Sequence, residues 1–287
     1  MEKTFSVLGG DQRQLYLAEL LEADGHRVGR YGFEKRGITS LLSLKQAAEA
    51  DCVVLPLPVT RDGERLHMPL SGGELPLEEL WQLLQGSRAV LCGGAISETV
   101  RRQAAARQLT IEDYFDREEV QVANAVPTAE GAVYEAMAAC PAALHGAKCL
   151  IIGYGRIGKV LAHRLQGLHA QVSVSARRLS DLAWIEAYGC RPLRTGALSG
   201  HLGDFDLVFN TVPVPLLCRA QLQELKESCV VVDLASAPGG VDLNAAAELG
   251  VPVRQARGLP GKAAPLTAAK VLRGAIYHIL EERGEPI

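Results

Sequence analysis

The stretch C-L-I-I-G-Y-G-R-I-G-K-V-L-A-H-R-L, residues 149 to 165, decides the fold of the C-terminal half of this 287-residue chain. It places Gly153, Gly155 and Gly158 in the spacing G-x-G-x-x-G between an apolar strand and a helix, the context that makes this pattern a dinucleotide-binding fingerprint. The first glycine permits a tight turn, the second lets a pyrophosphate approach the backbone, and the third lets helix and strand pack closely. The helix N-terminus then offers free N–H groups to the phosphates. The alternative is that these residues are only turn glycines.

The next strand, V-S-V-S-A-R-R at residues 172 to 178, ends in two arginines. An acid at this place would bind the ribose 2'-hydroxyl of NAD, whereas arginine accommodates the 2'-phosphate of NADP. A guanidinium can form a bidentate pair with phosphate oxygens, and the hydroxyl of Ser175 can add a hydrogen bond. We therefore predict that the cofactor is NADP, with Ser175 and Arg177 the first residues to test. The alternative is that the arginines are solvated loop charges, which suits Arg178 better than Arg177.

Two further strand ends, F-N-T-V-P at 209–213 and D-L-A-S at 233–236, should also face the cofactor. Ligands of an open parallel sheet lie beyond the carboxyl ends of its strands. Taken singly, Asn210 and Thr211 are as easily read as ordinary turn residues. The complete set predicted to bind the cofactor is Gly153, Tyr154, Gly155, Arg156, Ile157, Gly158, Ser175, Arg177, Arg178, Asn210, Thr211, Val212, Pro213, Ala235 and Ser236.

The rest of the chain alternates short apolar runs with amphipathic stretches, which predicts two α/β domains with doubly wound parallel sheets. Five runs precede residue 116, with helices over about 12–22 and 97–108. Residues 116–127 read as a linking segment, followed by a helix opened by Pro127 and Thr128 with Glu130 in its first turn. Six more strand-like runs then follow.

These patterns divide the chain into an N-terminal domain, residues 1–123, and a Rossmann domain, residues 124–263. The final segment, 264–287, opens with Pro265 and places Leu272, Ile276, Ile279 and Leu280 on one face of a helix. By analogy with two-domain dehydrogenases, we expect this helix to return to the first domain.

The composition is that of an ordinary soluble globular protein, with 48% hydrophobic and 22% charged residues and a formal charge of −3. This balance does not suggest a nucleic-acid surface.

No apolar run is long enough for a membrane span or a signal peptide, so we expect a cytoplasmic chain. The seven cysteines contain no C-x-x-C pair and read as reduced core thiols. The histidines show no metal-ligand spacing, so we expect no metal.

No residue announces itself as a catalyst, because the chain lacks a G-x-S-x-G elbow. The runs N-A-V-P-T-A-E-G and A-R-G-L-P-G-K-A-A-P-L-T are each expected to open a helix near the cleft between the domains and to attract carboxylates there. They are equally well read as hinges and caps. The turn L-G-G-D-Q-R-Q at residues 8–14 is a third candidate. The candidates for the substrate side are Asp11, Arg13, Thr128, Glu130 and Lys262.

Several of these motifs together carry a family resemblance. L-G-G-D-Q-R-Q, D-Y-F-D-R-E-E, N-A-V-P-T-A-E-G, G-Y-G-R-I-G, D-L-A-S-A-P-G-G-V-D and G-L-P-G-K-A-A-P-L-T occur in this order. The chain from about residue 6 to 280 closely resembles the A subunit of bacterial dipicolinate synthase. The A-S-x-P-G-G and G-L-P-G-x-x-A-P elements are far more specific than the glycine turn.

The resemblance implies a flavodoxin-like N-terminal domain joined to a Rossmann domain. It also implies a protein that, with a flavoprotein-like B subunit of dipicolinate synthase, makes pyridine-2,6-dicarboxylate in the mother cell of a sporulating bacterium. The substrate would be a dihydro- or hydroxytetrahydrodipicolinate from the lysine pathway, oxidised by NADP⁺. We also expect the chain to form a homo-oligomer.

Two other functions fit the same patterns. One is another NADP-linked dehydrogenase, for example of the 2-hydroxyacid type, although that family would want an arginine after D-L-A-S where this chain has A-P-G-G-V-D. The other is a non-catalytic regulatory subunit that binds NADP without turnover.

Overall fold

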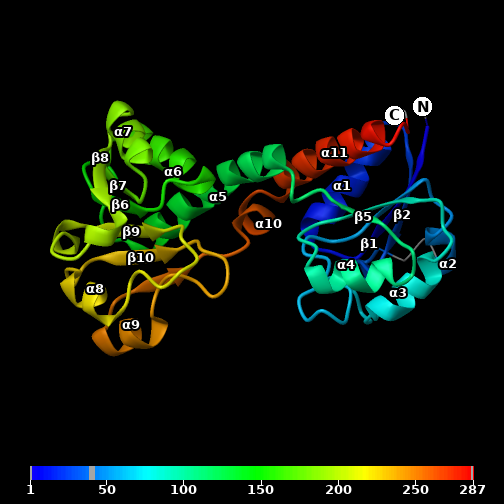
Figure 1. Cartoon of the computed structure of the whole chain (residues 1–287), viewed down its shortest axis with the longest axis horizontal. Coiled ribbons are helices and arrows are strands. Elements are labelled where there is room, and N and C mark those ends of the chain that lie inside the picture. Colours follow the sequence, from blue (N-terminus) through cyan, green and yellow to red (C-terminus); the bar gives the residue numbers. More distant parts are fainter. Residues whose placement is uncertain (1, 39–42, 286) are drawn as a thin grey trace. The chain divides into compact units, whose positions relative to one another are not determined.

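The computed structural model describes residues 2–38, 43–285 and 287. It divides into two compact units: unit 1 is Met1–Ala123 with Ala264–Ile287, and unit 2 is Asn124–Ala263. Figure 1 labels the helices and strands of both units. No helix in the described part of the chain combines the length and apolar character that a membrane crossing needs.

Unit 1 is built on a parallel sheet in the order β2-β1-β3-β4-β5. This is the flavodoxin-like strand order, in which the direction of winding reverses between β1 and β3. The strands are β1 Thr4–Leu8, β2 Arg27–Tyr31, β3 Cys52–Val54, β4 Val90–Gly93 and β5 Ile111–Asp113. The predicted flavodoxin-like fold is confirmed.

Helices cover both faces of this sheet. They are α1 Gln12–Ala23, α2 Leu44–Ala47, α3 Leu77–Leu84, α4 Glu98–Ala105 and α11 Pro265–Glu282, with a 3-10 turn η1 at Glu34–Arg36. Side chains of β3 alternate between two cores: Cys52 and Val54 pack with α1 and α11, and Val53 packs with α3 and α4. This alternation follows from the two-residue period of a strand, and it buries the sheet on both sides.

The C-terminal helix α11 returns to unit 1, as predicted. It begins with Pro265, and it lies beside α1 in Figure 1. The Tyr277 hydroxyl donates a 2.7 Å hydrogen bond to Asp24 at the end of α1, and Arg273 forms a 3.0 Å ion pair with the same carboxylate. The four apolar residues predicted to share one face of α11 are at most 2% exposed, and they are Leu272, Ile276, Ile279 and Leu280.

Unit 2 contains a parallel sheet in the order β11-β10-β9-β6-β7-β8. This is the dinucleotide-binding order, whose winding reverses between β6 and β9, so the predicted Rossmann fold is confirmed. The strands are β6 Lys148–Ile152, β7 Gln171–Ala176, β8 Arg191–Arg194, β9 Leu207–Asn210, β10 Val230–Asp233 and β11 Val253–Gln255.

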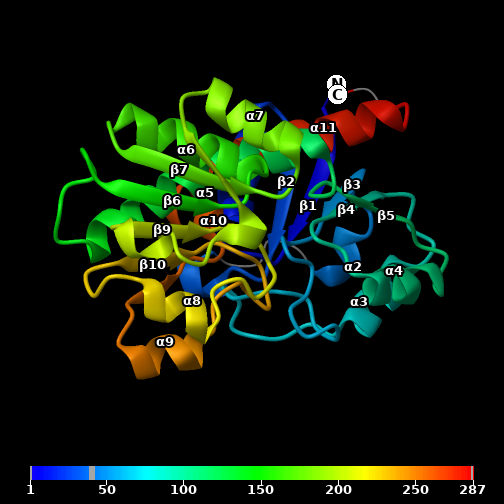
Figure 2. The same ribbon diagram turned by 60° about the vertical axis from the view of Figure 1, so that its left-hand side comes forward.

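The helices of unit 2 also form two layers. Figure 2 shows α6 and α7 on one side of the sheet and α8 and α9 on the other, and the two apolar cores have the same division. The elements are α6 Arg156–Gly167, α7 Leu179–Ala187, η2 Thr195–Ala197, η3 Leu202–Asp204, α8 Arg219–Glu224, α9 Leu243–Leu249 and α10 Leu259–Ala263.

Residues 116–127, read as a linking segment, contain the boundary between the two units, but from residue 118 they are helical, and the predicted helix start at Pro127 is wrong. One helix, α5, runs without interruption from Glu118 to Ala139 and contains Pro127 in its interior. Proline cannot donate the helical hydrogen bond expected at its position, but the Thr128 hydroxyl donates a 2.7 Å hydrogen bond to the carbonyl of Asn124 in the same turn. The acidic first turn of this helix is therefore Glu118 and Glu119.

Candidate functional site

The glycine turn lies between β6 and α6, at the carboxyl edge of the unit 2 sheet. Gly153 has φ +103°, and a Cβ there would lie 2.5 Å from the hydroxyl oxygen of Thr211. A Cβ on Gly158 would lie 2.1 Å from the Gly153 carbonyl oxygen, whereas one on Gly155 would meet no heavy atom within 4 Å. The first and third glycines are thus required by packing. The space over Gly155 is open, as the close approach of a pyrophosphate requires.

Side chains next to the turn secure its position. Tyr154 and Ile157 are half-buried against the core of unit 2, and the Lys159 ammonium lies 5.4 Å from the centre of the Tyr154 ring. Burial raises the pKa of the Tyr154 hydroxyl, so this phenol is neutral at physiological pH. Arg156 is the first residue of α6. The backbone N–H groups of that first turn have no helical acceptor, and they form an anion-binding end.

The arginines after β7 differ in their surroundings. Arg178 pairs with Asp181 of α7, with Nε 2.8 Å from a carboxylate oxygen, and this hydrogen bond raises the pKa of the guanidinium. Arg177 is exposed and forms no ion pair within the described part of the chain. The Ser175 side chain is fully buried, and its hydroxyl accepts a 3.2 Å hydrogen bond from Thr195. This placement argues against direct contact between Ser175 and a 2'-phosphate, because the hydroxyl is buried and already bonded to Thr195.

The ends of β9 and β10 are joined by a buried polar pair. Asn210 is 0% exposed and donates a 2.8 Å hydrogen bond to Asp233, which is 2% exposed. The Asn210 side chain also donates a hydrogen bond to the Val212 carbonyl and accepts one from the Val212 backbone N–H. A Cβ on Gly240 would lie 2.2 Å from the Asn210 amide nitrogen, so only glycine fits there. This pair shapes the two loops at the carboxyl edge, which explains the buried position of Asn210.

The remaining predicted cofactor residues lie on these two loops. The Thr211 hydroxyl donates a 2.9 Å hydrogen bond to the Ile152 carbonyl beside the glycine turn. Pro213 and Ser236 are exposed, and Ala235 is buried. The structure thus brings the glycine turn, Thr211 and the β10 loop to one edge of unit 2.

Arg257, at the end of β11, is a residue that the sequence reasoning passed over. One terminal nitrogen donates a 3.2 Å hydrogen bond to the Pro238 carbonyl in the A-S-A-P-G-G loop. Its Nε is buried and has no hydrogen-bond partner among the residues that the structure describes, which is unusual for a buried donor. The quoted run A-R-G-L-P-G-K contains this arginine, but only the contact with Pro238 places its charge beside the loop.

In unit 1 the predicted pair Asp11 and Arg13 lies at the carboxyl end of β1. Their ion pair is 2.8 Å long, and Arg13 also donates a hydrogen bond to the Leu57 carbonyl after β3. Asp11 caps α1 by accepting from the Arg13 backbone N–H. Burial raises the pKa of the Asp11 carboxyl, but the hydrogen bonds and charge of Arg13 outweigh it, so that the pKa lies below its ordinary value. The pair therefore stays ionised at the β1/β3 reversal of winding.

The other substrate-side candidates lie on helices of unit 2. Thr128 and Glu130 are interior residues of α5, where no free N–H group is available, and Glu130 lies 3.5 Å from Arg164. The proposed carboxylate site at a helix start there is wrong for that reason. Lys262 is exposed in the last turn of α10, just before Pro265 opens α11. No group of three or more potential metal ligands occurs in the residues that the structure describes.

Two family models match the chain, one in each unit. Residues 4–115 match the N-terminal domain of the dipicolinate synthase A subunit. Residues 117–245 match the NAD-binding domain of D-isomer-specific 2-hydroxyacid dehydrogenases. The second match agrees with the open glycine turn, and unit 2 is a nicotinamide dinucleotide-binding domain.

Full-length relatives agree with these two models. The dipicolinate synthase A subunit of Bacillus subtilis (strain 168) is 29% identical over 283 residues, which is 96% of this chain and 95% of that protein. The crystal structure of the Bacillus subtilis protein has a TM-score of 0.86 at 28% identity and covers 98% of this chain and 97% of its own. That of the A subunit from Bacillus halodurans has a TM-score of 0.86 at 26% identity and covers 97% of each chain.

Proposed function

We propose that this chain, a nicotinamide-dependent oxidoreductase that is related along almost its whole length to the A subunit of dipicolinate synthase, forms dipicolinate for sporulation. The substrate is 4-hydroxy-tetrahydrodipicolinate or dihydrodipicolinate. The hydroxylated compound first loses water. The dihydro ring then transfers one hydride to the nicotinamide and one proton to a base, which leaves the aromatic pyridine-2,6-dicarboxylate.

The observation that carries this proposal is the combination of an open nucleotide turn with an N-terminal domain of the dipicolinate synthase type. Aromatisation supplies much of the driving force for the hydride transfer. The protein's part is chiefly to hold the ring against the nicotinamide and to compensate the charge of two carboxylates. The absence of a recognisable acid-base dyad in the sequence is compatible with such a reaction.

The proposed cofactor is NADP. Arg177 supports it, because this exposed cation follows β7, where a 2'-phosphate would lie. Arg178 contributes less, since Asp181 already binds its guanidinium. The pyrophosphate would be held by the backbone of the glycine turn and by the first turn of α6.

On the substrate side we propose Arg13 in unit 1, whose Nε and Nη2 are bound by Asp11, so that only Nη1 is left for a carboxylate. In unit 2 we propose Lys262, which is exposed, and Arg257, whose guanidinium keeps one buried donor without a partner among the described residues. We further propose that the chain acts with the B subunit of dipicolinate synthase in the mother cell and assembles as a homo-oligomer. Catalysis in the mother cell would supply dipicolinate to the forming spore.

The test is to incubate the purified chain, with and without a candidate B subunit, with enzymatically generated hydroxytetrahydrodipicolinate and NADP⁺. Ultraviolet absorbance of pyridine dicarboxylate should rise in at least one mixture and only when the nucleotide is present. No cofactor-dependent rise in either mixture would contradict the proposal and favour a regulatory, non-catalytic role.

A further inference from the structure

Unit 1 contains a cavity of about 360 Å³ that no cofactor residue lines. Its wall includes the loop after β3, which is fixed over the β1–α1 turn because the Gly10 N–H donates a 2.9 Å hydrogen bond to the His67 carbonyl. The His67 N–H in turn donates to the Val59 carbonyl at 2.8 Å. The cavity therefore lies near the β1/β3 reversal of winding, where folds of this strand order bind ligands. Its volume is within the range of small-molecule sites, about 300–1,000 Å³.

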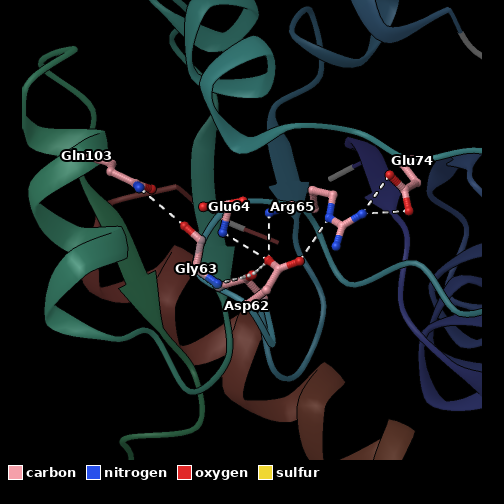
Figure 3. Close-up of polar contacts among 7 residues, drawn as sticks. Asp62, Gly63, Glu64, Arg65, Glu74 and Gln103 are labelled. Carbon is pink, nitrogen blue, oxygen red and sulfur yellow. Dashed lines mark hydrogen bonds and ion pairs between the residues drawn. The ribbon is translucent and has the colours of Figure 1, made fainter.

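One arginine of the cavity wall is already neutralised by the protein. Figure 3 shows the Arg65 guanidinium between two carboxylates, with Nε 2.9 Å from Asp62 and Nη1 2.7 Å from Glu74. Asp62 also accepts backbone hydrogen bonds from Arg65 and Glu64, both 2.9 Å long, which hold its pKa well below the ordinary value. The hydrogen bonds that Arg65 donates to Glu74 and Asp62 raise the pKa of its guanidinium. Arg65 thus stabilises the loop and has little charge left for a ligand.

The other arginine of the wall, Arg61, is differently placed. Its Nε donates a 3.3 Å hydrogen bond to Nε2 of His67, and within the described residues it pairs with no carboxylate. Burial, and then the charge of Arg61, lower the pKa of His67. The imidazole is therefore neutral at physiological pH and keeps an acceptor nitrogen for this bond. The two terminal nitrogens of Arg61 remain available, and Lys35 adds a second cation to the same wall.

We propose that this cavity binds one carboxylate of the substrate through the terminal nitrogens of Arg61, with His67 as the residue that positions the guanidinium. Guanidinium and carboxylate form short, charge-assisted, bidentate hydrogen bonds, so a planar dicarboxylate is the ligand class that this wall suits best. The inference rests on the proposed function, since it assigns the group that recognises the same dicarboxylate. It goes further in naming Arg61, Lys35 and His67, none of which belongs to a sequence motif.

The test compares Arg61→Gln with Arg102→Gln in the full-length chain. Arg102 lies on α4 of the same unit, its side chain is exposed, and it does not line the cavity, so Arg102→Gln controls for the loss of one positive charge. Dipicolinate is titrated into each protein and the heat of binding is measured. Loss of a charge-assisted hydrogen bond should weaken binding by about tenfold or more in Arg61→Gln. Arg102→Gln should bind within about twofold of the wild type, and the affinity of Arg61→Lys should lie between those of Arg61→Gln and the wild type.

The positioning role of His67 has its own readout. His67→Gln retains a side-chain acceptor for the Arg61 Nε, and His67→Leu removes it at similar size. We expect His67→Gln to retain most of the dicarboxylate affinity and His67→Leu to lose several-fold, with an unchanged thermal unfolding temperature in both. Equal affinities of these two variants would overturn the positioning role.

The outcomes separate this inference from the proposed function. If Arg61→Gln binds dipicolinate like the wild type, or if Arg102→Gln loses as much affinity as Arg61→Gln, the assignment of Arg61 is wrong, whatever the enzyme activity. If the wild type forms no dipicolinate but still binds it in an Arg61-dependent way, the proposed function fails and the carboxylate site stands. Benzoate, with a single carboxylate, should bind more weakly than dipicolinate yet show the same dependence on Arg61.

Discussion

Gly155 and Gly158 form a matched pair of substitution sites that separate cofactor binding from folding. Gly155 has φ −81°, which alanine adopts readily, and a Cβ there meets no heavy atom within 4 Å. Gly155→Ala should therefore change the stability of the free protein by less than about 0.5 kcal/mol. The new methyl group would, however, occupy the space through which a pyrophosphate approaches the turn.

Gly158→Ala should behave in the opposite way. The Cβ of an alanine at position 158 would lie 2.1 Å from the Gly153 carbonyl oxygen, and Cβ atoms in real proteins essentially never lie within 3.0 Å of such an atom. Helix α6 would have to move away from β6 by about 1 Å, and such overpacking costs about 1–3 kcal/mol. At about 2–4 °C per kcal/mol for a domain of this size, the unfolding temperature should fall by roughly 2–12 °C.

The assay combines thermal unfolding by circular dichroism, without nucleotide, with NADPH titration by fluorescence. We expect wild-type unfolding and an affinity for NADPH at least about tenfold lower in Gly155→Ala, as for the loss of one charge-assisted hydrogen bond. We expect Gly158→Ala to unfold at a lower temperature than the wild type. Wild-type NADPH affinity in Gly155→Ala, or equal destabilisation in the two variants, would refute this account of the turn.

Two further predictions concern charge and burial. Arg177→Ala should lower the affinity for NADPH by about ten- to a hundredfold and leave the affinity for NADH unchanged. Arg178→Ala should have little effect on either affinity, because Asp181 binds that guanidinium. Equal affinities of the wild type for NADPH and NADH would contradict the NADP assignment. Burial raises the pKa of the Cys149 and Cys229 thiols to about 12 from an ordinary 9.0. Both thiols should stay protonated at pH 8 and should not react with a thiol-reactive dye until the chain unfolds. The free energy of unfolding should fall as pH rises from about 9 towards 12, because the thiols of the unfolded chain ionise at a lower pH than those of the folded chain. Rapid labelling of either thiol in the folded protein, or an unchanged unfolding free energy over that pH range, would show that it is not buried as described.

The sequence predicted the strand series, the strand-to-helix glycine turn and the returning C-terminal helix, because each is written in local periodicity. It failed at Pro127, where a local rule against proline in helices favoured a helix start. Tertiary packing overrides that rule: α5 buries Val120 in the core of unit 1 and Ala129 and Ala132 in the core of unit 2. A continuous helix lets apolar residues of α5 pack in a core of each unit, and the Thr128 hydroxyl adds a hydrogen bond next to the proline.

The candidate site was predictable only where a motif encodes it. The spacing of the three glycines determines their geometry, so their roles could be stated in advance. Arg61, His67 and Arg257 belong to no motif. Their importance comes from loops that fold over strand ends, such as the bond between the Gly10 N–H and the His67 carbonyl. Ser175 shows the reverse case, since its place in the sequence suggested a ligand contact, whereas its side chain is buried and bonded to Thr195.

The most direct measurement is the stoichiometry of NADPH and dipicolinate in a single reaction, with the B subunit of dipicolinate synthase present. The proposed reaction transfers one hydride for each aromatic ring formed, so the two products should appear in equal amounts and at the same rate. Dipicolinate that accumulates without NADPH, or NADPH that forms without dipicolinate, would contradict the central claim that this chain oxidises the dihydropyridine ring with its nicotinamide cofactor.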